Sequence, residues 1–296
     1  HVFGNKGVAI LNRDDPAVMA LLPQTEVATV PAAGKKTAQP AKVPARRRVS
    51  FGCGIPQRAG DFGLETVNGM TWLVRAIEDE THIRPRKDAS ASPAMQLQRL
   101  MPAEALRIRG RHNACNALAA LALASETGAA LAPMLYGLRE YRGEAHRVEP
   151  VGVINGVEYF DDSKGTNVGA ALAALRGLGV ERKLVAILGG EGKGQDFAPL
   201  MPAVRAHCRA VVLIGRDAPL IETALTGSSV PLRHAPSLPE AVTLAADLAQ
   251  PGDAVLLSPA CASFDMFRDY AHRAEIFTEA VSALAQQQGT VLEGGI

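Results

Sequence analysis

The feature that most constrains the fold is an alternation of apolar runs and small-residue helical segments that begins at Val148. Short runs rich in Val, Ile and Leu have the length of buried strands, and segments with helical apolar spacing lie between them. The expected strands are 148–154, 157–160, 184–188, 210–214 and 254–257, and the expected helices are 168–178, 197–206, 219–225, 238–248 and 271–286. This alternation predicts an open, largely parallel α/β sheet. Asn155-Gly156 predicts a tight hairpin between the first two strands.

Three of the expected strands end in polar loops. Residues 161–167 follow the strand that ends at Phe160, residues 189–194 follow the strand at 184–188, and residues 258–265 follow the strand at 254–257. In open α/β sheets, ligands bind beyond the carboxyl ends of the strands. We therefore expect the three loops to form one binding site.

The loop at 161–167 reads Asp-Asp-Ser-Lys-Gly-Thr-Asn and leads into the expected helix at Val168. Thr166 and Asn167 are expected to cap that helix, because short polar side chains accept hydrogen bonds from first-turn N–H groups. Asp162 and Lys164 then project where a helix N-terminus attracts anions. Clusters of Asp and Ser are also common in turns without a function.

The other two loops offer a cation and hydroxyl groups. The Gly-Gly-Glu-Gly-Lys-Gly loop lets backbone amides approach an anion and presents Lys193, while the loop at 258–265 contributes Ser263. The chain has no Gly-x-x-x-x-Gly-Lys-Ser/Thr loop and no Gly-x-Ser-x-Gly turn. The sequence therefore predicts neither the phosphate cradle of nucleotide hydrolases nor a serine hydrolase site.

Length and charge limit the remaining classes of protein. The 296 residues, 47% of them apolar, are enough for two domains, and a net charge of +1 does not favour nucleic acid. The four cysteines show no paired metal-ligand spacing, which argues against a zinc site and for a reducing compartment. No apolar segment is long enough to span a bilayer, so we expect a cytoplasmic protein without membrane insertion.

The region before residue 148 mixes strands and helices. The expected strands are 7–12, 27–30, 49–51, 63–67 and 71–74, and the expected helices are 17–22, 117–126 and 133–141. Asn68-Gly69 predicts a hairpin. Residues 31–48, rich in Ala, Pro, Lys and Arg, predict a solvated loop. Its three final arginines suit a phosphate-binding patch, but an isolated basic run is more often a solvent-facing insertion. Residues 78–102 show no pattern that assigns them.

Two further motifs precede the α/β region. Asn113 and Asn116 lie three residues apart where the helix at 117–126 begins, so their amides share one face and suit one ligand. A capped helix with an exposed Asn explains the same residues equally well. The His146-Arg147 pair ends an expected connector between domains, although such pairs are usually surface features.

Taken in order, these motifs resemble the Mur ligase family. The matching segments are 110–113 with Asn116, 146–147, 162–164 with 166–167, 189–190 with Lys193, and 258–265, and the last of these is most similar to the members that add D-glutamate. The match is strong from about Leu106 onwards, weaker over 8–16 and loose over 31–102. It implies a partial ATP-binding central domain over 1–142 and a Rossmann-like C-terminal domain over 143–296.

The resemblance implies an ATP-dependent ligase of peptidoglycan precursor synthesis. ATP would phosphorylate the carboxylate of UDP-N-acetylmuramoyl-L-alanine, and D-glutamate would attack the acyl phosphate to form an amide. By matched position, Asn113, Asn116, His146, Arg147 and Asp162 would bind ADP; Lys193, Lys164 and Arg147 would be catalytic; and Thr166, Lys193, Ser263, Phe264 and Tyr270 would bind D-glutamate.

The family's phosphate loop and its Mg²⁺ ligands match no residue of this chain and are expected upstream of His1. We therefore expect the chain to be inactive as a fragment and to hold no metal. We also expect it to be a monomer. The alternatives are a Mur ligase that adds another amino acid, or a nucleotide-binding remnant without activity. Two residues depart from the family pattern: Gly165, which is expected to loosen its loop, and Ala274, each without loss of a reacting group.

Overall fold

The computed structural model describes residues 7–22, 47–78, 95–290 and 293–294. Contacts divide the chain into two compact units: described residues up to Ala105 with Cys115–Leu138, and Leu106–Ala114 with Arg139 onwards. The expected assignment of domains 1–142 and 143–296 stays a prediction, and the structure groups 106–114 with the second unit. Within the described ranges, no helix is long and apolar enough to cross a membrane.

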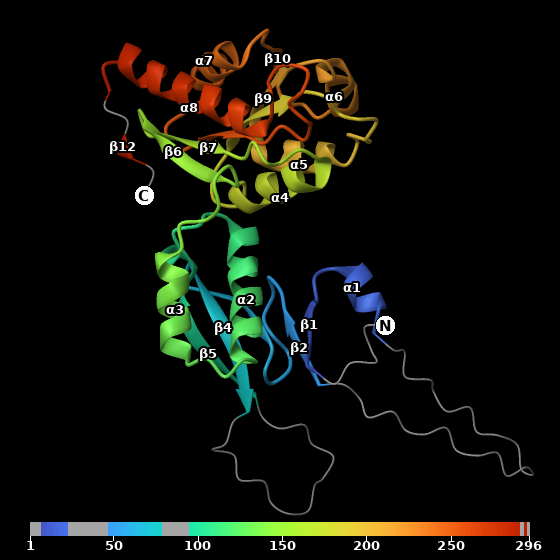
Figure 1. The fold of residues 1–296 in the computed structure, drawn as a ribbon, viewed down its shortest axis with the longest axis vertical. Helices are drawn as coiled ribbons and strands as arrows, with labels where there is room; N and C mark the ends of the chain where they lie inside the picture. Colours follow the sequence, from blue (N-terminus) through green and yellow to red (C-terminus); the bar gives the residue numbers. More distant parts are fainter. Residues whose placement is uncertain (1–6, 23–46, 79–94, 291–292, 295–296) are drawn as a thin grey trace, which may run out of the picture. The chain divides into compact units, whose positions relative to one another are not determined.

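The second unit is built on a seven-stranded sheet with the order β10-β9-β8-β11-β7-β6-β12 (Figure 1). Its strands are β6 (Glu149–Ile154), β7 (Val157–Asp161), β8 (Leu184–Gly189), β9 (Cys208–Ile214), β10 (Leu232–His234), β11 (Ala254–Leu257) and β12 (Glu293–Gly294). Strands β10 to β7 pair in parallel, and β6 and β12 are antiparallel. The prediction of an α/β fold with a largely parallel sheet is confirmed.

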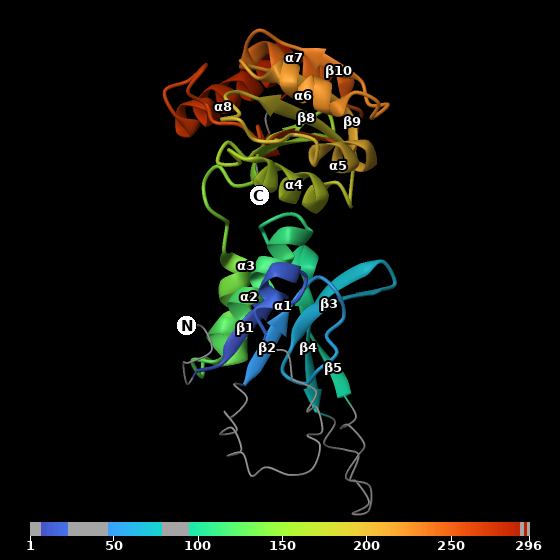
Figure 2. The same cartoon turned by 90° about the vertical axis from the view of Figure 1, so that its right-hand side faces the viewer.

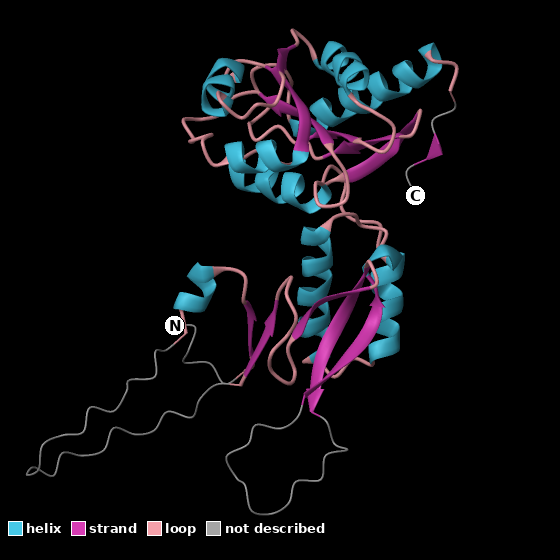
Figure 3. Ribbon diagram, turned by 180° about the vertical axis from the view of Figure 1, so that it is seen from behind, coloured by secondary structure: helices cyan, strands magenta, loops and turns pink. Residues whose placement is uncertain are grey.

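Helices cover both faces of this sheet (Figures 1 and 3). One core packs α4 (Val168–Leu178), α5 (Leu200–His207) and α6 (Ala218–Leu225) on the sheet, and the other packs α7 (Leu238–Leu248) and α8 (Tyr270–Gln287). In β8, Leu184 and Leu188 face the first core, while Val185 and Ile187 face the second. A strand buried on both faces needs an uninterrupted apolar run, which is the pattern of its sequence.

Most elements of this unit lie where the sequence predicts them. The bounds of α4, α7 and β11 are as predicted, and the Asn155-Gly156 hairpin joins β6 to β7. The short strand β10 was not predicted, because two of its three residues, Arg233 and His234, are polar and exposed. Its pairing with β9 alone defines it.

The first unit contains two small sheets (Figure 2). β1 (Ala9–Asn12) pairs in parallel with β2 (Arg48–Phe51), and β3 (Phe62–Val67), β4 (Met70–Glu78) and β5 (Met95–Pro102) form an antiparallel sheet. The helical elements of this part of the chain are α1 (Pro16–Ala20), a 3-10 turn (Ala103–Ala105), α2 (Arg111–Ser125) and α3 (Leu131–Glu140).

Several predictions for this unit need correction. β5 occupies part of the stretch that received no assignment, because its edge of the sheet is largely exposed and lacks an apolar run. Arg48 begins β2 instead of ending a loop, and Arg47 pairs with Glu126 at 2.5 Å. Helix α2 begins at Arg111, six residues before the predicted start at 117. The expected strand at 27–30 and the loop at 31–46 lie outside the described residues.

Candidate functional site

The three polar loops of the second unit lie together because their strands are neighbours. β7 and β8 both pair with β11 in parallel, so the carboxyl ends of all three strands meet at one edge. Backbone hydrogen bonds then join the loops: Ala260 N–H donates to Gly165 O at 3.0 Å, and Glu191 and Ala262 exchange bonds of 3.0 and 2.9 Å. The predicted convergence of the loops is therefore present.

Asp162 is the buried acid of the site. Its Oδ2 accepts a hydrogen bond of 2.6 Å from Ser258 Oγ, which links the first loop to the third. Burial raises the pKa of Asp162 to about 6, while the bond from Ser258 and the charge of Arg147 act in the opposite direction. Asp162 therefore accepts a hydrogen bond from Ser258, and it binds a proton more tightly than an ordinary carboxylate does.

Asp161 anchors the segment that enters the site. Its Oδ2 lies 2.8 Å from His146 Nδ1, and its Oδ1 accepts bonds of 2.9 and 2.5 Å from Ser163 N–H and Oγ–H. His146 and Val148 have φ values of 64° and 51°, which lie in the left-handed region. Residues other than glycine are uncommon there, and a β-branched residue such as Val148 is rare. This strained backbone holds His146 and Arg147 beside the loop at 161–167, where Lys164 N–H donates to His146 O at 3.1 Å.

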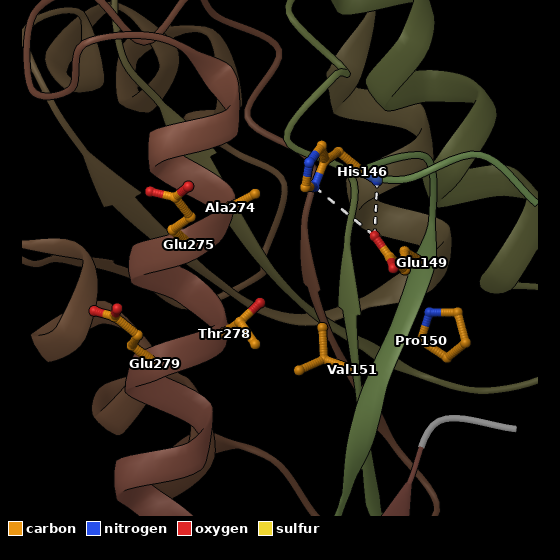
Figure 4. A pocket seen from close by; sticks show the side chains of 8 residues that line it. All are labelled: His146, Glu149, Pro150, Val151, Ala274, Glu275, Thr278 and Glu279. Carbon is orange, nitrogen blue, oxygen red and sulfur yellow. Dashed lines mark hydrogen bonds and ion pairs between the residues drawn. The ribbon is translucent and has the colours of Figure 1, made fainter.

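A cavity of about 450 Å³ lies beside His146, between the start of β6 and α8 (Figure 4). Glu149 Oε2 accepts the His146 N–H at 2.8 Å and lies 3.8 Å from its Nδ1, as the dashed lines show. The lining residues are His146, Glu149, Pro150, Val151, Ala274, Glu275, Thr278 and Glu279. With three of these carrying carboxylates, the cavity is unsuited to an anionic phosphate.

Lys164 and Tyr270 form a contact at the start of α8. Lys164 Nζ lies 3.7 Å from the centre of the Tyr270 ring, and the His146 ring meets the same tyrosine edge-on at 5.9 Å. An ammonium above an aromatic ring is attracted by the ring, so its position is restricted. The structure therefore brings together Lys164, His146 and Tyr270, three residues that the sequence placed in the site.

Lys193 stands on the glycine-rich loop after β8. Its side chain is exposed, with Nζ 5.4 Å from the ring of Phe264. The loop leaves the sheet through Gly190, where φ is 127° and a Cβ atom would lie 2.3 Å from Ala262 O. Only glycine fits that approach of the two backbones, which sets Lys193 opposite the third loop.

Thr166, Asn167 and Ser263 complete the site. Asn167 caps α4 by accepting the Ala170 N–H at 2.9 Å, whereas Thr166 lies one residue before the cap. Ser263 is 2% exposed, and its carbonyl accepts the Met266 and Phe267 N–H groups. The first turn of α8, beside Tyr270, already has an N-cap carboxylate, because Asp269 accepts the His272 N–H at 2.8 Å.

The two asparagines lie in the first turns of α2. Asn113 Nδ2 donates to Arg109 O at 2.8 Å, so part of its amide is engaged within the second unit. Asn116 is exposed on the same helix and groups with the first unit. Their role toward a nucleotide stays a prediction.

Arg273 is a site residue that reasoning from the sequence missed. It is fully buried, and its guanidinium donates to Ser163 O at 2.8 Å and to Cys261 O at 3.2 Å. Burial lowers the pKa of Arg273 to about 10. The hydrogen bonds of Arg273 join the first loop to the third from beneath. The sequence around Arg273 does not distinguish it from the other charged residues of α8, and charged residues on a helix are normally exposed.

Comparisons with known proteins agree with the motifs. Residues 146–261 match the family described as "Mur ligase, glutamate ligase domain". Two proteins named UDP-N-acetylmuramoylalanine–D-glutamate ligase, from Albidiferax ferrireducens and a Polaromonas species, are 60% and 62% identical over 99% and 98% of this chain. The chain spans 56% and 48% of their lengths, about half of the curated relatives it matches.

Solved structures share the fold. The MurF ligase of Thermotoga maritima in complex with ADP superposes with a TM-score of 0.54 at 15% identity, over 96% of this chain and 55% of that one. The second MurF structure from Acinetobacter baumannii gives 0.52 at 17% identity, over 93% and 52%. The family match is thus confined to residues 146–261, the similarity to the two ligases extends over nearly the whole chain, and the solved structures show a shared fold.

Proposed function

We propose that this chain forms the ADP and D-glutamate side of a UDP-N-acetylmuramoyl-L-alanine:D-glutamate ligase. The observation that carries the proposal is the meeting of Lys164, Lys193 and Ser263 at the carboxyl ends of three adjacent strands, in a chain 60% identical to a ligase of that name. Two cations and a hydroxyl suit a substrate with two carboxylates. The expected monomer and cytoplasmic location stay predictions.

The reaction would join a carboxyl group to an amine. ATP transfers its γ-phosphoryl group to the carboxylate of UDP-N-acetylmuramoyl-L-alanine, which releases ADP. The D-glutamate nitrogen then attacks the acyl carbon, a C–N bond forms, the C–O bond to phosphate breaks, and the amine loses a proton. Positioning and charge stabilisation supply most of the catalysis in such transfers.

Each residue has a role that follows from its place. Asp162, a buried acceptor, suits the ribose hydroxyls of ADP, and the exposed Arg147 beside it suits a phosphate. Lys193 and Thr166 would hold the α-carboxylate of D-glutamate, and Ser263 its side-chain carboxylate. Lys164, restrained by Tyr270, would stabilise charge on the transferred phosphoryl group.

The expected Mg²⁺ ion does not fit the described residues of this site. The nearest group with ligand spacing is His146, Glu149 and Asp161. Both oxygens of Asp161 already take hydrogen bonds from His146 and Ser163, and Mg²⁺ prefers an octahedron of oxygen ligands. The ligands of this ion are therefore expected among residues other than these three.

Calorimetry on the 296-residue chain tests the proposal. We expect D-glutamate to bind and Lys193→Ala to weaken it by about ten- to a hundredfold, the value of one charge-assisted hydrogen bond. Lys183→Ala is the matched control, because Lys183 lies at the opposite end of β8 and donates to Ala206 O. Ser263→Ala should weaken D-glutamate binding and leave ADP binding unchanged.

Two outcomes would favour the alternatives. Binding of a diaminopimelate or lysine in place of D-glutamate would indicate a Mur ligase that adds another amino acid. Binding of ADP without any amino acid would indicate a nucleotide-binding remnant.

A further inference from the structure

Asp14, Cys53 and Cys115 come together in the first unit, although they are distant in the sequence. One ligand atom from each, the two sulfurs and a carboxylate oxygen, lie within 4.8 Å of one another. The proposed ligase function uses none of the three. Their sequence spacing argued against a zinc site, because the two cysteines are 62 residues apart.

The parallel pair β1 and β2 brings Asp14 and Cys53 together. Asn12 is in register with Phe51, so both strands end at the same edge and their loops leave side by side. Asp14 Oδ2 accepts the Cys53 N–H at 2.5 Å. A Cβ atom on Gly52 would lie 2.6 Å from Asp14 Oδ1, so glycine is needed for this approach.

Neighbouring contacts fix the loop that carries Cys53. The Arg13 guanidinium donates to Phe62 O at 2.6 Å, to Gly54 O at 2.5 Å and to Gly52 O at 3.3 Å. Cys115 is buried in α2, whereas Cys53 is half-buried and Asp14 is exposed. The cluster therefore has a rigid, buried side and a side open to solvent.

We propose that Asp14, Cys53 and Cys115 bind a thiophilic divalent cation of the Zn²⁺ class. Two thiolates and a carboxylate are ligands that Zn²⁺ accepts, and three protein ligands leave a fourth position for water or a ligand atom. The exposed face at Asp14 is where that fourth position would lie.

Binding of a cation to the two sulfurs releases their protons, so the affinity for the cation should rise with pH.

Cobalt(II), a spectroscopic substitute for Zn²⁺, tests the site in the reduced 296-residue chain under anaerobic conditions. We expect one Co²⁺ per chain with a near-ultraviolet thiolate-to-metal charge-transfer band, competed away by Zn²⁺. Cys53→Ser and Cys115→Ser should abolish the band, and the buried Cys208→Ser in the second unit should retain it. Asp14→Asn should weaken binding at least about tenfold, since losing even an outer-shell partner costs this much.

Circular dichroism of each variant shows whether the fold is kept, and Asp14→Asn, which alters an exposed residue, keeps the test decisive if a cysteine variant unfolds. The proposal is overturned if the chain binds no Co²⁺, or if the charge-transfer band survives in a folded Cys53→Ser or Cys115→Ser variant.

Discussion

Replacement of Asp162 by Asn should change how the stability of the protein depends on pH. The pKa of Asp162 is raised from 3.8 to about 6 in the folded chain, chiefly by burial. At 1.36 kcal/mol for each pKa unit, this difference corresponds to about 3 kcal/mol. Asp162 is 6% exposed, so solvent screening reduces this value little.

The direction of the pH dependence follows from the number of protons bound in the folded and in the unfolded chain. Below pH 3.8 the folded and unfolded chains both carry the Asp162 proton, and the contribution of this group to stability is complete. Between pH 3.8 and about 6 only the folded chain keeps the proton, so the free energy of unfolding falls as pH rises. Above that range the carboxylate is ionised while buried, and the full cost of burying its charge lowers the free energy of unfolding.

Two measurements check this prediction. Urea unfolding followed by circular dichroism should show that the difference in stability between the native protein and Asp162→Asn changes by up to about 3 kcal/mol between pH 4 and pH 7. A carboxyl-carbon NMR titration, assigned with the same variant, should give a midpoint near 6.

Asp253→Asn is the control with the opposite sign. Burial acts to raise the pKa of Asp253, but the hydrogen bonds from Arg209 and the Gln250 N–H, together with the charges of Arg209 and Lys183, outweigh it, and the net pKa is lowered. Its stabilising contribution is therefore lost only as pH falls below the ordinary aspartate range. A midpoint for Asp162 at or below 4, or a stability difference that does not vary with pH, would refute our account of its burial.

Two further substitutions test the packing beneath the loops. Arg273→Met should destabilise the protein by about 1 to 3 kcal/mol, because two buried carbonyls lose charge-assisted bonds while the desolvation of the guanidinium is relieved; an unchanged melting temperature, as expected for the exposed Arg268→Met, would contradict this. Gly165→Ala should cost about 1 to 3 kcal/mol, since its Cβ would lie 2.5 Å from Asp162 Oδ2. Gly137→Ala, with open space around it on α3, should be neutral or stabilising, and equal melting shifts for both glycines would exclude a steric cause.

The contact at Gly165 also revises an expectation. The resemblance implied a glycine that loosens its loop, but Gly165 N–H donates to Asp162 O at 2.7 Å and its carbonyl accepts the Ala260 N–H at 3.0 Å. The missing side chain makes room for the buried carboxylate instead. The tight packing depends on Ser258, which is 93 residues away in the sequence and reaches the same space.

The sequence by itself determined the α/β class, the bounds of α4, α7 and β11, and the loops that carry Asp162, Lys193 and Ser263. These features are local: apolar periodicity reports which face of an element is buried, and short polar runs report where a strand ends. Asn-Gly pairs marked both hairpins for the same reason, since left-handed backbone at the turn is a property of the residues themselves.

Only the tertiary structure decided the rest, because it depends on contacts between residues far apart in the chain. β10 is a strand through its pairing with β9, and Arg273 is buried because the first and third loops meet above it. Asp14, Cys53 and Cys115 form a cluster because β1 and β2 end at the same edge and the sulfur of Cys115, in α2, lies within 4.8 Å of the other two ligand atoms. The sequence records which side chains are available, whereas the position of one relative to another follows from the packing of whole elements.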